Sequence, residues 1–532
     1  TPSLAGQTIT LGSKLVIDKN LTIDNSDNSS RITISGGSAY RIFQVNNGKS
    51  LTLRNFNLGN GKPASSGDGG AILNEGGSVT IYDVYFYNNV ATIGGAIRTN
   101  GGTITIFRAD FFGNLSTSTG GKGVAIFNDA GTLIIHDSDF GYNQADFDGG
   151  AIYNYGTLEV NGSSFHNNQT ILYKGGGIFS SGSATITNST FLSNSAENGG
   201  GIFMHGGASL TLINSTLDSN TARLSDPKAA GAVYAFGPLT LRNSILSNST
   251  ASVDCYWNHS IGSPVVSNNL IEVNSAASSA CGTPILTSDP VLDALLYNGG
   301  ETPTMALLPG SPAINAGDNI RCADTDQRGV KRPYGSTCDI GAFEYTDPLV
   351  INSLTPSQKQ INSGGFTLTV NGSGFHSTSV VVFNGEDLST DRKSGSKLEA
   401  IVGGSFPEVD QIEVFVSTPG VGNKSNSAFF NVYSFADVLP THPLWRYVEG
   451  FFAKGITTGC AVNPLRYCPD RGVTRAEMAV FILRAKDGLA TPVPNPENVG
   501  IFADVPTAGK EWMKPWIEEF YGQGITTGCA VN

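Results

Sequence analysis

The sequence predicts a mainly β protein: a right-handed parallel β-helix, then a β-sandwich, then a C-terminal region of short α-helices. Three observations support this prediction. A motif recurs about every 25 residues in the first half of the chain, alternating apolar and polar residues mark short strands, and helical periodicity begins only near residue 434. The length of 532 residues also exceeds that of one ordinary domain.

Two phrases define the repeat. The first is Gly-Gly-Ala-Ile, found at residues 69–72, 94–97 and 149–152, with looser copies later. The second is a short alternating strand that leads to a Phe, with an Asn three residues further on. The Phe positions are Phe86, Phe111, Phe140, Phe165 and Phe191, with Leu217 in the next place. The Asn positions are Asn89, Asn114, Asn143, Asn168, Asn194 and Asn220, and successive spacings are 25, 29, 25, 26 and 26.

This spacing predicts a coil with three short strands and three corners per turn. Glycine doublets suit the corners because glycine tolerates positive φ. Equivalent residues then stack from turn to turn, with Phe inside the coil and Asn amides in a ladder along one corner. A β-sandwich would instead show irregular hairpins of about 8–12 residues. We therefore predict a parallel β-helix over residues 1–284, with starting turns and an N-terminal cap over 1–68.

Residues 285–346 are expected to close the coil. Their phrases at 288–290, 309–314, 326–329 and 339–344 resemble the closing segment of bacterial secreted β-helix proteins in the polymorphic-outer-membrane-protein-like class. The resemblance covers about residues 1–346 and implies a segment that ends the helix and is not catalytic. We interpret Asp326, Arg328 and Asp339 as a buried structural network in this cap.

No catalytic residue is predicted on the coil. Polysaccharide cleavage requires carboxylates that converge from adjacent turns, and acids do not line up at the position three residues before each Phe. That position holds Asp83, Arg108, Asp137, Gly162, Asn188 and Asn214. The best acidic cluster is interpreted as a solvated corner and consists of Asp139, Asp146 and Asp148. Three histidines occupy unrelated turn positions: His136, His166 and His205. No cofactor or metal site is predicted, although a structural Ca²⁺ is compatible with such a coil.

Residues 347–433 are predicted to form an Ig-like β-sandwich. Short alternating strands are separated by glycine turns, and Asn384-Gly385 marks a tight turn. The phrases "INSLTP" at 351–356, "GGFTLTVNGSGF" at 364–375 and "VVVFNG" at 380–385 resemble the IPT/TIG family. In extracellular proteins this resemblance implies a spacer, with ligand binding as the less favoured alternative.

Two copies of one module follow, over residues 434–500 and 501–532. "FADV" at 435–438 recurs at 502–505, and "GITTGCAVN" at 455–463 recurs at 524–532. An amphipathic helix lies between the two phrases in each copy. Thr474 and Glu477 have capping-box spacing before a second helix over 478–485. The ordered motifs, including "VTRAEMAVFILRA" at 473–485, resemble S-layer homology (SLH) modules.

The SLH resemblance implies non-covalent anchoring to pyruvylated cell-wall polysaccharide. By that resemblance Arg475 contacts the acidic sugar, and a guanidinium fork suits a carboxylate; a salt bridge between modules is the alternative. Trp445 and Trp516 are candidates for stacking on a sugar, with a role in the helix core as the alternative. The family packs three modules, whereas this sequence stops inside the second, so we expect the natural chain to continue past Asn532.

The seven cysteines favour an oxidising compartment. Three local pairs are Cys255 with Cys281, Cys322 with Cys338, and Cys460 with Cys468, and Cys529 is left over. Without CxxC spacing, local pairs favour disulfides over a zinc site, with buried free thiols as the alternative. Cys529 corresponds to Cys460, so its partner is expected beyond residue 532. The N-terminus carries no basic-then-apolar leader and is interpreted as cytoplasmic or already processed; the cysteines favour the second interpretation.

Charge and hydropathy exclude two partner classes. The net charge of −12 argues against nucleic acid, which requires a basic patch. The sequence contains no run of 18 apolar residues, so it predicts no membrane-spanning helix.

The sequence predicts a secreted, non-enzymatic protein of the bacterial cell surface or S-layer. Its β-helix stalk would serve adhesion or self-assembly into a layer or filament, and its SLH modules would dock on cell-wall polysaccharide. The alternative is a wall-anchored polysaccharide lyase or glycoside hydrolase that uses the outer groove of the β-helix. Two or three carboxylates within about 10 Å on the outer face would favour that alternative.

Overall fold

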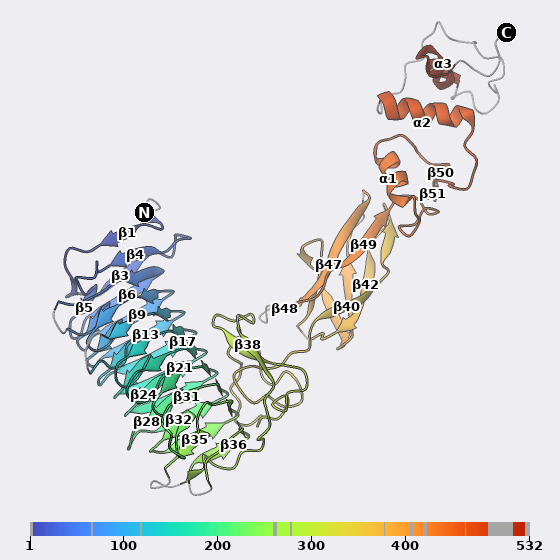
Figure 1. Cartoon of the computed structure of the whole chain (residues 1–532). Coiled ribbons are helices and arrows are strands. Elements are labelled where there is room, and N and C mark those ends of the chain that lie inside the picture. Colours follow the sequence, from blue (N-terminus) through green and yellow to red (C-terminus); the bar gives the residue numbers. More distant parts are fainter. Residues whose placement is uncertain are drawn as a thin grey trace. The chain divides into compact units, whose positions relative to one another are not determined.

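The chain divides into two compact units, with the main break between Thr346 and Asp347. The computed structural model describes residues 4–64, 67–116, 120–258, 263–276, 279–376, 378–404, 406, 408–418, 423–462, 464–487 and 514–526. Figure 1 labels the strands and helices of both units.

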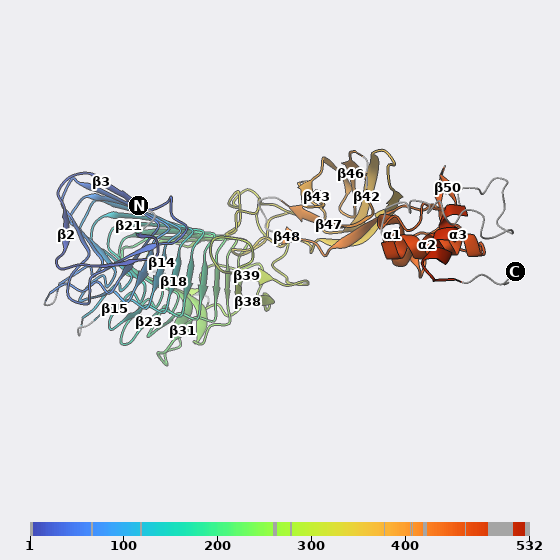
Figure 2. The ribbon, with the colours of Figure 1, turned by 90° about the horizontal axis from the view of Figure 1, so that it is seen from above.

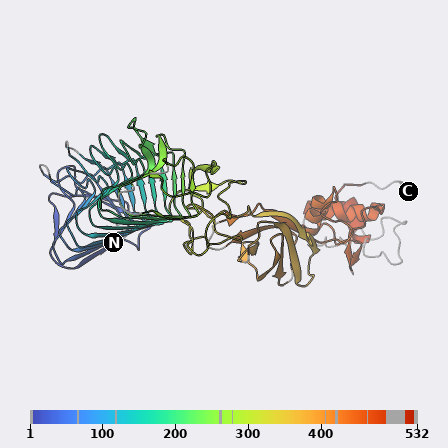
Figure 3. The same cartoon turned by 90° about the horizontal axis from the view of Figure 1, so that it is seen from below.

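The first unit is a parallel β-solenoid of about ten turns, which confirms the predicted parallel β-helix. Three long sheets run along it, and their strands pair in parallel from turn to turn (Figure 3). Sheet 1 contains β1 (Thr8–Thr10), β4 (Ile32–Ser35), β7 (Phe56–Gly59), β10 (Tyr85–Tyr87), β14 (Asp110–Phe112), β18 (Asp139–Gly141), β22 (Ser164–His166), β26 (Thr190–Leu192), β30 (Thr216–Asp218), β34 (Ile245–Ser247) and β37 (Leu270–Ile271).

Sheets 2 and 3 have ten strands each. Sheet 2 contains β2 (Leu15–Ile17), β5 (Phe43–Val45), β8 (Ile72–Asn74), β12 (Ile97–Thr99), β16 (Ile126–Asn128), β20 (Ile152–Asn154), β24 (Ile178–Ser180), β28 (Ile202–Met204), β32 (Ala230–Ala235) and β35 (Val253–Trp257). Sheet 3 contains β3 (Leu21–Asp24), β6 (Ser50–Arg54), β9 (Ser78–Tyr82), β13 (Thr103–Phe107), β17 (Thr132–His136), β21 (Thr157–Asn161), β25 (Ser183–Thr187), β29 (Leu210–Ile213), β33 (Leu239–Arg242) and β36 (Val265–Ser267).

The prediction of three strands per turn is incomplete, because a fourth sheet of two-residue strands follows sheet 1 in six turns. Two residues are too short to show an alternating pattern, so this sheet leaves no signal in the sequence. Sheet 4 contains β11 (Val90–Ala91), β15 (Leu115–Ser116), β19 (Gln144–Ala145), β23 (Gln169–Thr170), β27 (Ser195–Ala196) and β31 (Thr221–Ala222).

The solenoid core is a stack of like residues. Phe86 pairs with Phe111, and Phe111 with Phe140, in direct register. The rings stack nearly parallel with centroids 4.5 and 4.7 Å apart, and all three side chains are fully buried. Parallel strands lie about 4.8 Å apart, so a ring on each turn fills the interior without voids. The alternating burial within each strand thus directs one face inward and leaves the other for surface chemistry.

At the corner three residues before each Phe, the backbone conformation determines which residue types occur. Asp83, Arg108 and Asp137 all have positive φ, at 57°, 49° and 50°. This left-handed conformation favours Asp, Asn and Gly, which explains why the position holds those residue types on most turns. At the glycine-doublet corner, a Cβ on Gly94 (φ 61°) would lie 2.3 Å from the Ile97 carbonyl oxygen, so that turn requires glycine.

The closing segment does more than end the coil. It forms a hairpin of β38 (Leu292–Leu296) and β39 (Thr304–Leu307) and folds back along the outer face of sheet 1. Ser164 Oγ donates to the Pro303 carbonyl over 2.5 Å, and the Ala342 N–H donates to Thr216 Oγ1 over 3.0 Å. The segment therefore covers the later turns of sheet 1.

The second unit begins with two sheets. One has the order β40-β42-β46-β45 and the other β41-β49-β47-β43-β44, with β48 also on β47; β42, β43, β46 and β47 are labelled in Figure 2. Their apolar residues share one buried core that includes Val370, Val414 and Phe430. The strands are β40 (Val350–Thr355), β41 (Gln358–Gln360), β42 (Phe366–Ser373), β43 (Val380–Phe383), β44 (Glu386–Asp387), β45 (Thr390–Ser394), β46 (Lys397–Val402), β47 (Asp410–Thr418), β48 (Asn423–Lys424) and β49 (Ala428–Tyr433).

Three helices and a small hairpin follow. They are α1 (Trp445–Ala453), α2 (Arg475–Asp487), α3 (Lys514–Gly522), β50 (Ala461–Val462) and β51 (Leu465–Arg466). The second helix is longer than the predicted 478–485, because it starts directly after the Thr474 cap. None of the helices in the described ranges is long and apolar enough to span a lipid bilayer.

Candidate functional site

The outer face of sheet 1 carries two columns of outward side chains. The residue before each stacked Phe forms the first column, and the residue after it forms the second. The first column runs Tyr85, Asp110, Asp139, Ser164 and Thr190. The second runs Tyr87, Phe112, Gly141, His166 and Leu192. Acidic and aromatic side chains therefore share one surface.

Asp110 and Asp139, hereafter the acid pair, are direct register partners on β14 and β18. The sequence interpretation that acids do not line up on successive turns is wrong at this column. It was based on the corner three residues before each Phe, whereas the acid pair lies one residue before. Neighbouring parallel strands are about 4.8 Å apart, so the two carboxylates approach each other closely on the outer face.

The pKa of Asp110 is raised to about 6. Partial burial is the main cause, and the negative charge of Asp139 raises the pKa further. Arg31 opposes this shift, with Nη1 3.6 Å from Asp110 Oδ2. Burial and the charge of Asp110 raise the pKa of Tyr85, and burial with the charges of Asp139 and Asp110 raises the pKa of Tyr297 in the closing segment.

Asp139 is more deeply buried than Asp110, with 5% of its side chain exposed against 35% for Asp110. His166 Nε2 lies 3.3 Å from Oδ1 and 3.4 Å from Oδ2, and its hydrogen bond is directed at Oδ2. No described residue donates a hydrogen bond to the buried Oδ1. This oxygen has almost no accessible surface, and the His166 ring 3.3 Å away is its electrostatic partner.

Aromatic rings flank the acid pair. The Tyr85 ring stacks on Tyr87 with centroids 5.4 Å apart and lies 6.0 Å from Phe112. Phe112 in turn lies 6.4 Å from Tyr142. We call these four residues the aromatic strip. A Cβ at Gly141 would lie 2.5 Å from the Phe112 ring, so glycine here lets that ring close over the strand.

Replacing Asp110 with asparagine is expected to stabilise the protein at pH 8 and not at pH 4. Its raised pKa means that the native state binds more protons than the unfolded state between about pH 4 and 6. Wild-type stability therefore falls as pH rises through that window, and the neutral amide removes this loss. We expect a gain of about 1 kcal/mol at pH 8, after allowing for solvent screening of a side chain one-third exposed.

Thermal unfolding at pH 4, 6 and 8 measures this effect. Asp27→Asn, which changes an exposed acid on the same unit, is the control and should show no pH-dependent gain. A variant at Asp110 that is less stable than the wild type at pH 8 would contradict the expectation.

The six predicted asparagines lie in one buried ladder beside sheet 4, a structural position that does not expose them to ligands. Nδ2 of each of the first five donates to Oδ1 of the asparagine one turn on, over 2.9–3.1 Å from Asn89 to Asn220. Each also donates to a main-chain carbonyl of the preceding turn, as Asn143 does to Phe111. The ladder thus joins six successive turns.

Three disulfides join the cysteine pairs that the sequence singles out. The bonded pairs have Cα–Cα distances of 6.0, 6.7 and 6.1 Å, for Cys255–Cys281, Cys322–Cys338 and Cys460–Cys468. Cys529 lies outside the described residues. The described residues contain one group spaced to hold a metal ion, Asp437 with Cys460 and Cys468. Both sulfurs are in the disulfide, and the Asp437 carboxylate accepts the backbone N–H groups of Tyr467 and Cys468, so the group is structural.

Neither predicted sugar-stacking tryptophan presents an open ring. Trp445 is 8% exposed, packs in a core with Phe435, and donates from Nε1 to Glu449 over 3.0 Å. Trp516 is 6% exposed and packs against Val480 and Leu483. Burial of both indoles favours the core role, which was the alternative interpretation of the sequence, and sugar stacking stays an untested prediction.

Thr474 and Glu477 form the reciprocal capping box. The Thr474 N–H donates to Glu477 Oε2 over 2.9 Å, and the Glu477 N–H donates to Thr474 Oγ1 over 3.2 Å. The side chain of Arg475 lies outside the described residues, although its backbone begins α2.

The other acids that the sequence singled out lie on different elements and have different partners. Asp146 and Asp148 follow sheet 4, whereas Asp139 is on sheet 1, so the predicted corner cluster is not a single group. Asp148 Oδ1 accepts the Lys174 backbone N–H over 3.0 Å. In the closing segment, Arg328 pairs with Asp326 over 2.8 Å with both side chains almost fully buried, as the sequence interpretation of a structural network expects.

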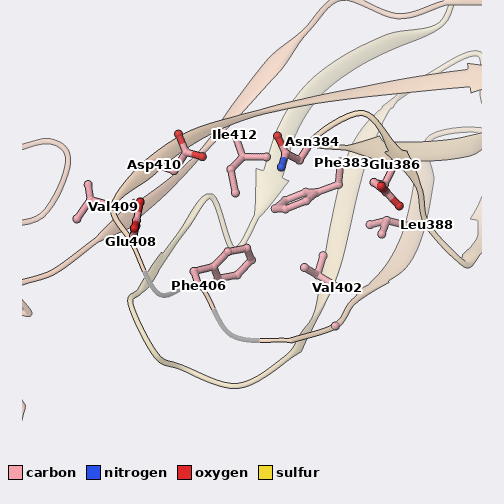
Figure 4. Close-up of a pocket in the computed structure, with 11 residues that line it drawn as sticks. Phe383, Asn384, Glu386, Leu388, Val402, Phe406, Glu408, Val409, Asp410 and Ile412 are labelled. Atoms are coloured by element: carbon pink, nitrogen blue, oxygen red, sulfur yellow. The ribbon is translucent and has the colours of Figure 1, made fainter.

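A separate cavity of about 600 Å³ lies in the second unit. Figure 4 shows its apolar floor of Phe383, Phe406 and Ile412. Its described charged lining residues are acidic and include Glu386 and Asp410, both exposed. The sequence gives no signal for this cavity, because its walls come from strands that meet only in the folded unit.

Two comparisons with known proteins found no match. No protein-family model matches the sequence. No curated protein matches it either. The β-solenoid fold is established by the structure, and the functional inferences rest on the residues of this chain.

Proposed function

We propose that this chain is an exported bacterial surface protein whose second unit anchors it to cell-wall polysaccharide. The first unit would project as a stalk for adhesion or for assembly into a surface layer or filament. The proposal is carried by the ordered motifs at 435–438, 455–463 and 473–485, which resemble SLH modules. Three disulfides are compatible with an oxidising compartment and support export.

Local geometry around those motifs supports the SLH assignment. Asp437 of the "FADV" phrase binds two backbone N–H groups of the turn that ends at Cys468, and Thr474 with Glu477 caps α2. Both motifs therefore have a folding role that places the start of α2, and with it Arg475, at a fixed helix terminus. The two-sheet core before them supports an IPT/TIG-like spacer role for residues 347–433.

A second candidate function is cleavage of a polysaccharide on the outer face of the solenoid. One observation favours it: the acid pair brings two carboxyl groups from adjacent turns to one column of the outer face, and glycoside hydrolysis uses a pair of carboxylates. If this function is correct, the full-length protein releases reducing ends from a polysaccharide, and Asp110→Asn abolishes that release.

Arg475→Ala is expected to reduce binding of the full-length protein to purified cell-wall sacculi by about tenfold or more. A guanidinium–carboxylate pair with the pyruvyl group is strong and directional, and alanine removes both its charge and its fork. Co-sedimentation at several protein concentrations measures the change. Arg446→Ala, at an exposed arginine on α1, is the matched control. Unchanged sedimentation of Arg475→Ala, or no sedimentation of the wild type, would overturn the anchor.

A further inference from the structure

The outer face of sheet 3 carries two straight rows of hydroxyl side chains, hereafter the hydroxyl rows. Every second residue of its strands points outward, and equivalent positions pair in direct register from turn to turn. The first row contains Ser50, Ser78, Thr103, Thr132 and Thr157. The second row, two residues further along each strand, contains Thr22, Thr52, Thr80 and Thr105.

The hydroxyl rows are open to solvent, and the protein does not use their hydroxyl groups. Ser78 and Thr157 are exposed, while Thr80 and Thr105 are half-buried between their neighbours in the row. Among the described residues, none forms a hydrogen bond with the hydroxyl of Thr52, Thr80 or Thr105. A branched threonine side chain has a restricted χ1 angle, so these free hydroxyls hold fixed positions.

The other two long sheets do not present such an array. On sheet 1, the hydroxyls of Ser164 and Thr190 bond to the closing segment. On sheet 2, the outward positions hold stacked rings such as Tyr153 and Phe179. The preference of threonine for strands would favour it on all three sheets alike, so it does not explain why the open rows lie on sheet 3.

The face that bears the hydroxyl rows is flat. Tyr82 and Phe107 extend from β9 and β13 on this face, and their rings differ in orientation by only 6°. Inside the coil, Phe86 and Phe111 on the same two turns are parallel within 1°. Successive turns are therefore hardly rotated, and the rows form a regular two-dimensional array instead of following the usual twist of a sheet.

The spacing of this array matches that of ice. Neighbouring turns are about 4.8 Å apart, and alternate residues of a strand are about 6.6 Å apart. Water molecules in ice are hydrogen-bonded about 2.75 Å apart in a tetrahedral network, so oxygen rows on its prism face repeat about every 4.5 Å in one direction and about every 7.3 Å in the other. Both spacings agree within about a tenth. We propose that the hydroxyl rows bind the surface of ice.

The charge on this face suits an uncharged ligand. From β6 to β13 the hydroxyl rows contain no charged residue. Beside them, Arg54 pairs with Asp24 over 3.7 Å, so that these two charges offset each other. Further along, Ile134 and Glu159 interrupt the second row. The three complete turns from β6 to β13 are therefore the centre of the site, and over so short a length the mismatch with the ice spacing stays below about 1 Å.

Slow growth of ice in a solution of the full-length protein tests the inference. Growing ice excludes ordinary solutes, so we expect the wild type to be enriched in the ice fraction. Thr80→Tyr places a large ring in the middle of the flat face and should reduce the incorporated fraction by about tenfold. Thr105→Val keeps the branched shape and removes one hydroxyl, and it should also reduce incorporation. Circular dichroism of both variants checks that the solenoid is intact.

Thr367→Tyr is the matched control, because it changes an exposed strand threonine of the β-sandwich. Its incorporation should equal that of the wild type. Exclusion of the wild type from ice would overturn the inference, and so would equal incorporation of the wild type and both row variants. Exclusion from ice together with sedimentation on crystalline chitin would instead assign the rows to a polysaccharide. Arg475→Ala should still enter ice, so a failed anchor and a failed ice site give different results.

Discussion

Replacing Arg332 with alanine is expected to lower the free energy of unfolding of residues 1–346 by about 3–5 kcal/mol. Arg332 Nη1 donates to Glu344 Oε2 over 2.7 Å and to the Asp339 carbonyl over 3.0 Å, and Nη2 donates to the Gly341 carbonyl over 2.7 Å. Both charged side chains are at most 1% exposed. The substitution leaves Glu344 as an unpaired buried charge and removes one donor each from the Asp339 and Gly341 carbonyls.

The penalty should depend on pH in a defined direction. Burial raises the pKa of Glu344, and Arg332 opposes that shift. Without Arg332 the pKa rises further, so lowering the pH protonates Glu344 and removes the cost of its buried charge. We therefore expect the destabilisation to be larger at pH 8 than at pH 5.

Denaturant unfolding of the full-length protein, followed by circular dichroism at both pH values, measures this effect. Lys331→Ala changes an exposed cation next to Arg332 and should shift stability by less than about 0.5 kcal/mol. A loss below about 1 kcal/mol for Arg332→Ala would show that the pair does not hold the closing segment in place.

The buried charged residues of the closing segment could be predicted from the sequence only in part. Asp326, Arg328 and Asp339 are identifiable because they are charged residues within the phrases at 326–329 and 339–344. Arg332 and Glu344 carry the most buried pair and were not identified. They lie 12 residues apart without any regular period, so only the folded loops bring them together.

The fold was predictable wherever equivalent residues recur at one spacing. The Phe stack follows directly from the 25-residue register, and in the structure Leu58 takes the place of Phe86 one turn earlier. The return of the closing segment over sheet 1 was not predictable, because its hydrogen bonds join residues more than 100 positions apart, such as Thr190 and Gln327. No local pattern encodes such a contact.

The acid pair was visible in the sequence, since Asp110 and Asp139 each precede a stacked Phe. The sequence interpretation missed it because it compared the residues three positions before each Phe. At that corner the backbone has a positive φ, which favours Asp or Asn whatever their function. A comparison of every outward column would have found it. Burial of Trp445 and Trp516, by contrast, could not be predicted from the sequence, because an amphipathic pattern does not reveal which side of a large aromatic ring faces the core.

Asn143→Ala is expected to destabilise the solenoid by about 3–5 kcal/mol, through loss of several buried hydrogen bonds at once. Asn143 Nδ2 donates to the Phe111 carbonyl and to Asn168 Oδ1, both over 2.9 Å. Its Oδ1 accepts the backbone N–H of Asn114 over 3.2 Å and the side-chain Nδ2 of Asn114 over 3.0 Å. All three asparagines are fully buried, so water does not replace the lost partners.

Two further variants separate hydrogen bonding from packing. Asn143→Asp keeps the shape of the side chain but replaces the donor amide with an oxygen that faces two acceptors, so it should destabilise at least as much as alanine at pH 8. Gln144→Ala removes an exposed amide that pairs with Gln169 over 2.6 Å in the next turn, and should cost less than about 0.5 kcal/mol. Equal melting temperatures for Asn143→Asp and Gln144→Ala would mean that turn-to-turn stability comes from the Phe stack and not from the amide ladder.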